Sequence, residues 1–153
     1  MKKTSIAECP ETKAEHGAFA YRRKRLGDAA GAQRIGCSWT EIGPGKKAFP
    51  FHFHNANEEA VYILEGEGVL RSGDEEIALR AGDYVSFPVG PPGHQVINRS
   101  AGILRYLALS TMIDPEVSVY PDSNKIAAYG KSVPGAPRIY RAAAGVDYYE
   151  GEE

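Results

Sequence analysis

The 153-residue sequence has few cysteines, no long apolar segment and no excess of charge of one sign. Its two cysteines, Cys9 and Cys37, are far apart and outside any Cys-x-x-Cys pattern, which predicts free thiols rather than a disulfide framework or structural zinc. No stretch approaches the ~20 apolar residues that a bilayer-spanning helix needs, and no apolar signal-peptide core follows Met1. We therefore expect a cytoplasmic protein that does not bind membranes.

The overall charge also excludes some classes of partner. Eighteen basic and twenty acidic residues give a formal net charge of -2, which argues against a nucleic-acid partner. Hydrophobic residues make up 42% and charged residues 25% of the chain, close to the globular average, so a disordered chain is excluded. A chain of this length predicts one domain with a real core.

Glycine, proline and tyrosine are abundant, with 17, 10 and 9 residues, and they favour short strands joined by tight turns over long helices. Each β-prone segment must bury one face against another sheet, so the pattern predicts an all-β sandwich or barrel. In 60–64, apolar or aromatic residues occupy both alternating faces, which predicts a central strand buried on both faces. The segments expected as strands are 35–42, 49–54, 60–64, 68–72, 75–79, 84–88, 93–98 and 103–110.

The β-prone segments divide the chain into three parts. Residues 1–33 show no sustained apolar period and are expected to form an N-terminal arm, in which the basic run 22–25 is interpreted as solvated or ion-paired. Residues 34–110 contain the predicted barrel. Residues 111–153 are rich in proline and predict an extended tail that packs on the barrel or on a partner subunit. Arms at both ends and uncovered sheet edges predict a homodimer.

Histidine is rare, yet three of the four histidines fall in a metal-binding pattern. His52 and His54 are one residue apart, so on a strand both imidazoles project from the same face. Glu59 opens the next predicted strand and can fold back toward them. His94 follows a glycine-proline turn some 40 residues later, on a strand that a barrel would bring alongside. The fourth histidine, His16, lies outside this pattern.

Three imidazoles and one carboxylate suit Fe(II), Mn(II), Ni(II), Co(II) or Zn(II), and an octahedral ion would keep open positions for a ligand. Two alternatives remain open from the residues alone. Glu58 could replace Glu59 as the ligand, or could orient a histidine. The histidines could also simply pack the barrel without any metal.

Two motifs carry a resemblance to a known family. The first is Gly45-x6-His52-x-His54-x4-Glu59-x6-Gly66, and the second is Gly82-x5-Pro88-x-Gly90-x3-His94-x3-Asn98. In this order they resemble the two motifs of the cupin superfamily, each with one additional residue in a loop. The resemblance covers about residues 34–110. It implies a jelly-roll barrel, or double-stranded β-helix, with His52, His54, Glu59 and His94 as metal ligands. The flanking segments are similar to small single-domain bacterial cupins described as sugar-phosphate-isomerase-like.

The resemblance and the residues together suggest a function. We expect a metal-binding cupin that takes a small polar ligand, such as a sugar phosphate or a carboxylate, into the barrel, with isomerisation as one possible reaction. Alternatives are a non-catalytic binding module and a metal-dependent dioxygenase or decarboxylase. The candidate ligand-binding residues are Lys46, Tyr62, Arg71 and Asn98.

Overall fold

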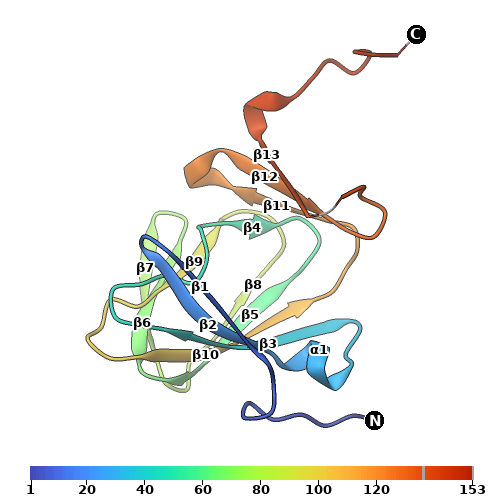
Figure 1. Cartoon of the computed structure of the whole chain (residues 1–153). Helices are drawn as coiled ribbons and strands as arrows, with labels where there is room; N and C mark the ends of the chain where they lie inside the picture. Colours follow the sequence, from blue (N-terminus) through green and yellow to red (C-terminus); the bar gives the residue numbers. More distant parts are fainter. Residues whose placement is uncertain (136, 153) are drawn as a thin grey trace.

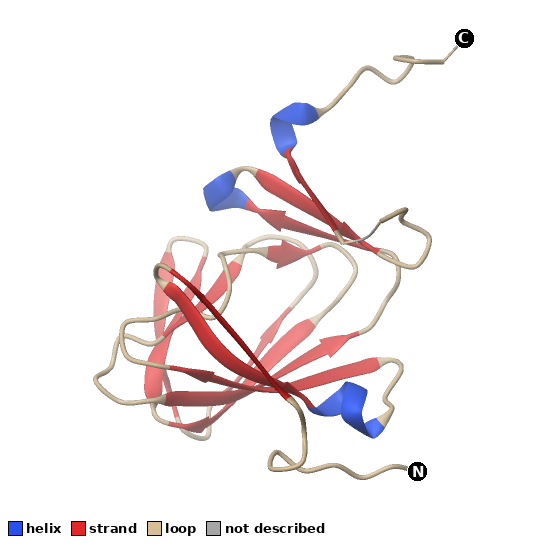
Figure 2. Cartoon of the chain, in the orientation of Figure 1, coloured by secondary structure: helices blue, strands red, loops and turns tan. Residues whose placement is uncertain are grey.

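The computed structural model describes residues 1–135 and 137–152 and consists mainly of antiparallel strands (Figures 1 and 2). Its one α-helix among these residues, α1 (Leu26–Ala30), is five residues long. None of the helices in this part of the chain is long and apolar enough to span a membrane. The strands are β1 (Glu11–His16), β2 (Phe19–Arg25), β3 (Ile35–Ile42), β4 (Phe53–His54), β5 (Glu59–Glu65), β6 (Glu67–Ser72), β7 (Glu75–Arg80), β8 (Tyr84–Phe87), β9 (His94–Ile97), β10 (Leu104–Thr111), β11 (Glu116–Tyr120), β12 (Lys125–Tyr129) and β13 (Arg138–Arg141).

The strands form a jelly-roll barrel, which confirms the predicted all-β fold class. A six-stranded sheet in the order β1-β2-β3-β10-β5-β8 curves around a three-stranded sheet in the order β7-β6-β9 (Figure 1). Inward-facing side chains from both sheets form one apolar core, because alternate residues of each strand point to the same face. The buried core residues are Ile42, Ala48, Val61, Ile63, Leu70, Leu79, Phe87, Val96, Leu104 and Tyr106.

Each of the eight predicted strands corresponds to a strand in the structure, but one of them is much shorter than expected. Within 49–54 only Phe53–His54 is a regular strand, while His52 forms an isolated bridge to His94. Pro50 has no N–H group to donate to a neighbouring strand, so the pairing cannot extend through it. The two cysteines, Cys9 and Cys37, are both unpaired, as predicted.

β5 is central in its sheet, between β10 and β8, but the prediction that both of its faces are buried is wrong. Val61 and Ile63 are buried in the core, whereas Tyr62 and Leu64 are 39% and 38% exposed on the opposite face. The six-stranded sheet is covered on one side only at this point, so the alternating side chains of β5 meet the core and the solvent in turn.

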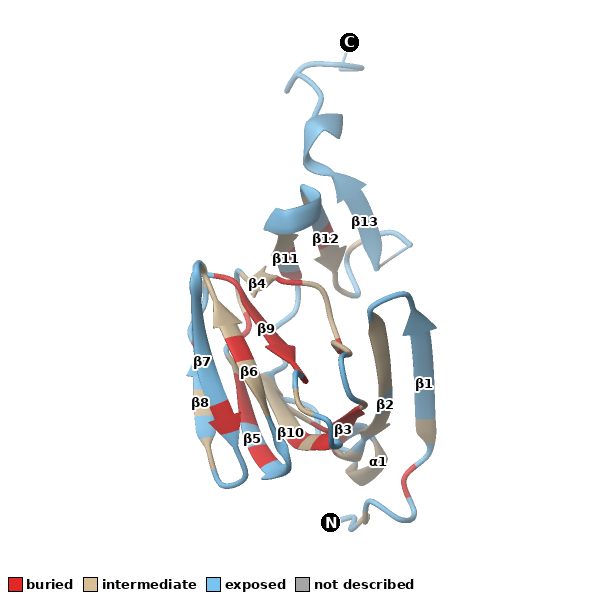
Figure 3. Ribbon diagram, turned by 90° about the vertical axis from the view of Figure 1, so that its left-hand side faces the viewer, coloured by how far each residue is buried: buried red, intermediate tan, exposed pale blue. Residues whose placement is uncertain are grey.

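The N-terminal segment is an ordered part of the larger sheet. β1 and β2 form an antiparallel hairpin, and β2 pairs with β3 from Arg22 opposite Glu41 to Arg25 opposite Ser38. The hairpin therefore adds two strands to the edge of the barrel sheet. In the view of Figure 3 it lies on the side of the barrel opposite β7.

The C-terminal segment forms a second small sheet, in the order β13-β12-β11-β4. β11 pairs with β4 through Ser118 opposite His54 and Val119 opposite Phe53, so this sheet is joined to the barrel beside His54. All four residues of β13 are exposed, and the chain beyond it extends away from the barrel (Figures 1 and 3). The proximal part of the tail thus packs on the barrel, while packing on a partner subunit remains a prediction.

Candidate metal centre

His52 and His94 are brought together by the barrel itself. The backbone N–H of each donates to the carbonyl oxygen of the other, at 3.2 and 2.8 Å. Gly93 permits this approach, since a Cβ there would lie 2.8 Å from the Phe51 ring and 3.1 Å from the carbonyl oxygen of His52. His54 follows on β4 and projects to the same side as His52, as the one-residue spacing predicts.

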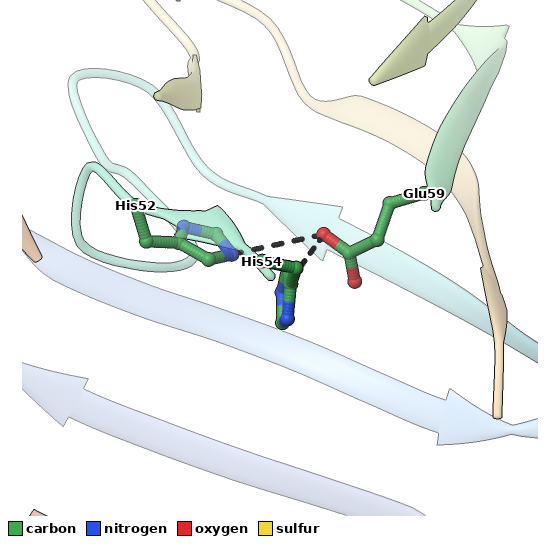
Figure 4. Close-up of side chains that lie close together, drawn as sticks. All are labelled: His52, His54 and Glu59. Atoms are coloured by element: carbon green, nitrogen blue, oxygen red, sulfur yellow. Dashed lines mark ion pairs between the residues drawn. The ribbon is translucent and has the colours of Figure 1, made fainter. Parts of the chain in front are cut away.

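Glu59, the first residue of β5, reaches all three histidines with one carboxylate oxygen. Its Oε2 lies 3.7 Å from His52 Nε2, 3.3 Å from His54 Nε2 and 3.1 Å from His94 Nε2. Figure 4 shows His52 and His54 converging on this oxygen. The structure therefore brings together all four residues of the predicted ligand set, and places Glu59 rather than Glu58 among the imidazoles.

The arrangement fits a transition-metal ion. Two donor atoms that are each ~2.1 Å from one ion, at angles of about 90 to 110°, are roughly 3.0–3.4 Å apart. The separations between the imidazole nitrogens and the Glu59 oxygen are close to this range. The donor atoms of His52, His54 and Glu59 all lie within 4.8 Å of one another, and His94 joins this group through Glu59.

The other ring nitrogens of two histidines are held by hydrogen bonds that leave Nε2 free for a metal. His52 Nδ1 is 2.7 Å from the carbonyl oxygen of Pro50, so Nδ1 carries the proton and Nε2 keeps its lone pair. His54 Nδ1 lies 3.0 Å from Ser118 Oγ and 3.5 Å from Glu116 Oε2. Such contacts fix the tautomer and the ring orientation of a metal-binding histidine.

Glu116 is a site residue that the sequence analysis missed. It is 6% exposed and accepts hydrogen bonds from the backbone N–H groups of Asn55, Ala56 and Asn57, at 3.0, 3.2 and 2.7 Å. It therefore holds the loop between His54 and Glu59 while its other contact orients His54. No local signal marks it, because it lies in the proline-rich tail and reaches the site only through the pairing of β11 with β4.

The charges of the cluster depend on one another. Burial would raise the pKa of Glu59, but the interactions of its carboxylate with the three surrounding imidazoles outweigh burial and hold this pKa well below its usual range. Burial would likewise lower the pKa of His54, yet Glu59 and Glu116 outweigh it and raise that pKa. For His94, burial dominates and lowers the pKa. The carboxylate is thus ionised throughout the physiological range and available as a ligand.

Comparison with known proteins agrees with this geometry. A sequence model of the cupin domain matches residues 38–110. Residues 38–110 form a cupin domain. A comparison with curated proteins finds no match to this cupin.

Two solved structures resemble this cupin over nearly its whole length. One is a protein from Acidithiobacillus ferrooxidans, named provisionally a sugar phosphate isomerase, with 28% identity and a TM-score of 0.82. The alignment covers 93% of this chain and 91% of that one. The other is a cupin from Silicibacter pomeroyi named a sugar phosphate isomerase, with 25% identity, a TM-score of 0.83 and coverage of 97% and 98%. The similarity thus includes the segments outside residues 38–110.

The cluster opens into a cavity of about 830 Å³. Val61, Phe87 and Val96 contribute apolar walls, and the Phe87 ring stacks on His94 with centroids 4.0 Å apart and planes 7° apart. Tyr106 and Tyr120 bring two phenol groups to the same space, and burial raises the pKa of each above its ordinary value. The cavity is wide enough for a small metabolite, and both hydroxyls stay protonated, that of Tyr120 in a 2.9 Å hydrogen bond with the Tyr129 hydroxyl.

All four predicted ligand-binding residues lie outside this cavity lining. Lys46 Nζ donates to the carbonyl oxygen of Gly17 at 2.9 Å. Tyr62 is on the outer face of β5, because its neighbours Val61 and Ile63 occupy the inner one. Arg71 pairs with Asp122 at 2.6 Å on the surface.

Asn98 is fully buried and is engaged within the barrel frame. Its Nδ2 donates to the carbonyl oxygens of Ile42 and Gly102, at 2.9 and 2.8 Å. Its Oδ1 accepts from the backbone N–H and the hydroxyl of Ser100, at 3.0 and 2.8 Å. All the hydrogen-bonding capacity of the side chain is thus used to close the turn between β9 and β10, and none faces a ligand.

Arg23 lies in the cavity, a position that the sequence analysis did not predict. The basic run 22–25 was expected to be solvated or ion-paired, and Arg22 is indeed ion-paired, but Arg23 lines the cavity. The period of two along β2 is the signal that could have shown this, since Tyr21 on the same face packs against the core.

Proposed function

We propose that this cupin binds one divalent transition metal ion, Fe(II), Mn(II), Ni(II), Co(II) or Zn(II), through His52, His54, Glu59 and His94. The observation that carries the proposal is the convergence of three imidazole nitrogens on one carboxylate oxygen at the wall of the cavity. The ionised Glu59 and the oriented Nε2 atoms form a donor set of the hardness that these ions prefer.

We further propose that the cupin binds a small oxygen-rich ligand in this cavity and acts as a sugar phosphate isomerase. A bound ion of this kind supplies Lewis-acid polarisation of a carbonyl or hydroxyl oxygen. Tyr106 lines the same space, as does the hydrogen-bonded pair Tyr120 and Tyr129, and these hydroxyl groups would form hydrogen bonds with ligand oxygens. The names given to the two similar structures support this reaction class at 28% and 25% identity.

The first test is elemental analysis of the untagged protein purified without chelator, beside a His52→Ala/His94→Ala double variant. We expect about one equivalent of metal in the wild type and none in the double variant. No metal in the wild type, even after reconstitution, would return the histidines to the role of packed barrel residues.

The second test separates an enzyme from a binding module. The metal-loaded protein and the His52→Ala variant are screened on sugar phosphates, small keto acids and diols. Interconversion of an aldose and a ketose phosphate that the variant lacks supports the isomerase. Binding without turnover indicates a non-catalytic module, and consumption of dioxygen or release of carbon dioxide indicates a dioxygenase or decarboxylase. We also propose that the protein works as a cytoplasmic homodimer.

A further inference from the structure

β2 carries two neighbouring arginines in opposite environments. Arg22 faces outward and is paired with Glu11 at 2.7 Å and with Glu41 at 2.9 Å. Arg23, on the opposite face of the strand, lines the cavity that contains the candidate metal centre. The chain thus directs one guanidinium group into a surface ion-pair network and the next into the barrel.

The guanidinium of Arg23 has no anionic partner among the residues that the structure describes. Its Nε is fully buried and makes no hydrogen bond there, and its Cζ lies over the Phe49 ring, 5.4 Å from the ring centroid. Burial lowers the pKa of Arg23, and the nearby positive charge of Arg25 lowers it further. The nearby carboxylate, Glu59, is already shared by three imidazoles.

Further polar atoms lie close to Arg23. Arg23 is directly opposite Thr40 on β3, and Thr40 is directly opposite Tyr106 on β10, so these three side chains form a row across the inner face of the sheet. Thr40 Oγ1 is buried without a partner among the described residues. Gln95 also lines the cavity, and its buried Oε1 is unpartnered in the same part of the chain, while its Nε2 donates to the carbonyl oxygen of Phe49 at 2.7 Å.

Arg23 is half-buried, and a cation held in a cavity without a counter-charge costs folding free energy, as does each buried polar atom that makes no hydrogen bond. Two such groups, the Nε of Arg23 and the Oε1 of Gln95, belong to residues that line one cavity. If Arg23 only filled space, an apolar side chain of similar volume would do so without this cost in folding free energy. Groups that are unfavourable in the free protein are instead typical of binding sites, where the ligand supplies the missing partners.

We propose that Arg23 is the anion-binding residue of the cavity, and that the ligand of this cupin carries an oxyanion group, phosphate or carboxylate, which the guanidinium fork binds. This proposal rests on the proposed function, because it places the anion in the same cavity as the metal. It restricts the ligand to anionic metabolites. The fork suits both oxyanions, since each can accept two parallel N–H hydrogen bonds. Gln95 Oε1 would accept from a hydroxyl of the same ligand.

The test measures binding of inorganic phosphate, and in parallel of acetate, to the full-length nickel-loaded protein by isothermal titration calorimetry. Arg23→Met keeps the length of the side chain and removes its charge, whereas Arg23→Lys keeps the charge and removes the fork. Arg22→Met is the matched control, since it removes the neighbouring arginine on the outer face. Metal content and unfolding temperature are recorded for every variant.

We expect at least one of the two anions to bind the wild type, and Arg23→Met to weaken that binding at least about tenfold with unchanged metal content. Arg23→Lys should be intermediate and Arg22→Met unchanged. The unfolding temperature of the ligand-free Arg23→Met variant should be equal to or higher than that of the wild type. Tighter binding of phosphate than of acetate would indicate that the anionic group of the ligand is a phosphate. The reverse order would indicate a carboxylate.

The proposal is overturned if neither anion binds the wild type, or if an anion binds the wild type and Arg23→Met equally well. It is also overturned if Arg23→Met has a lower unfolding temperature than the wild type, because Arg23 would then be a structural residue. If the wild type takes up no metal, the proposed function fails. The same comparison in the metal-free protein then decides the role of Arg23 separately.

Discussion

His52 and His94, 42 positions apart in the sequence, form a reciprocal pair of backbone hydrogen bonds, and their rings lie with centroids 4.6 Å apart. The two candidate ligands are therefore placed by main-chain pairing between the segment before β4 and the start of β9. A site built in this way is rigid, because moving either imidazole requires breaking the pairing that closes the barrel. This rigidity underlies the predictions on metal binding.

The first prediction concerns the two adjacent glutamates before β5. Glu59→Gln should reduce metal occupancy to a small fraction of one equivalent, because it removes the carboxylate that faces the Nε2 atoms of all three imidazoles. Glu58→Gln is the matched control and should retain full occupancy, since its side chain takes no part in the cluster. Inductively coupled plasma mass spectrometry of both variants measures the difference, and equal losses would assign Glu58 a share of the site.

A second prediction concerns Glu116, which orients His54 without being a proposed ligand. Glu116→Gln should weaken nickel affinity by about 10- to 100-fold, the usual effect of removing a partner that orients a metal-binding histidine. It should also lower the unfolding temperature, because three backbone N–H groups lose a charged acceptor. Glu76→Gln, which breaks an exposed pair with Arg99, is the control. Wild-type nickel affinity in Glu116→Gln would show that Ser118 alone orients the ring.

The buried amide of Asn98 gives a third prediction, on stability rather than on binding. Asn98→Ala should lower the free energy of unfolding by about 2–4 kcal/mol, since it leaves buried carbonyl and N–H groups without partners. Metal stoichiometry of the folded protein should stay unchanged. Urea unfolding gives the first quantity and elemental analysis the second. Loss of metal at unchanged stability would instead place Asn98 in the ligand site.

Metal affinity should depend on pH through His54. Its raised pKa means that a proton competes with the metal at pH values above those at which an ordinary histidine does so. The apparent nickel affinity should therefore fall as the pH is lowered from 8 to 6, by at least about tenfold, with net proton release on binding. Calorimetry in buffers of different ionisation enthalpy measures both. A constant affinity over this interval would contradict the proposed ligand set.

The last prediction concerns assembly. The C-terminal segment exposes Ile139, Tyr140, Tyr148 and Tyr149 beyond the barrel, and β13 is an unprotected edge strand in the described chain. We expect the full-length protein to sediment as a dimer at micromolar concentration. Sedimentation as a monomer in that range would contradict the homodimer.

The sequence alone determined the barrel and its candidate metal ligands. Turn residues at short intervals mark where each strand ends, so the eight strands of the barrel region could be located from local chemistry. The spacing of His52, His54 and Glu59 is also local, because a period of two and a short loop decide which side chains share a face. These features survive in the structure because they depend on neighbours in the chain.

Only the tertiary structure decided what the two flanking segments contribute. Glu116 reaches His54 because β11 pairs with β4, and Arg23 enters the cavity because β2 extends the sheet at β3. The same holds for Asn98, whose Nδ2 reaches the carbonyl oxygen of Ile42 at the end of the distant strand β3. Pairing between distant strands depends on the whole sheet, and a one-residue change of register would turn each of these side chains to the other face.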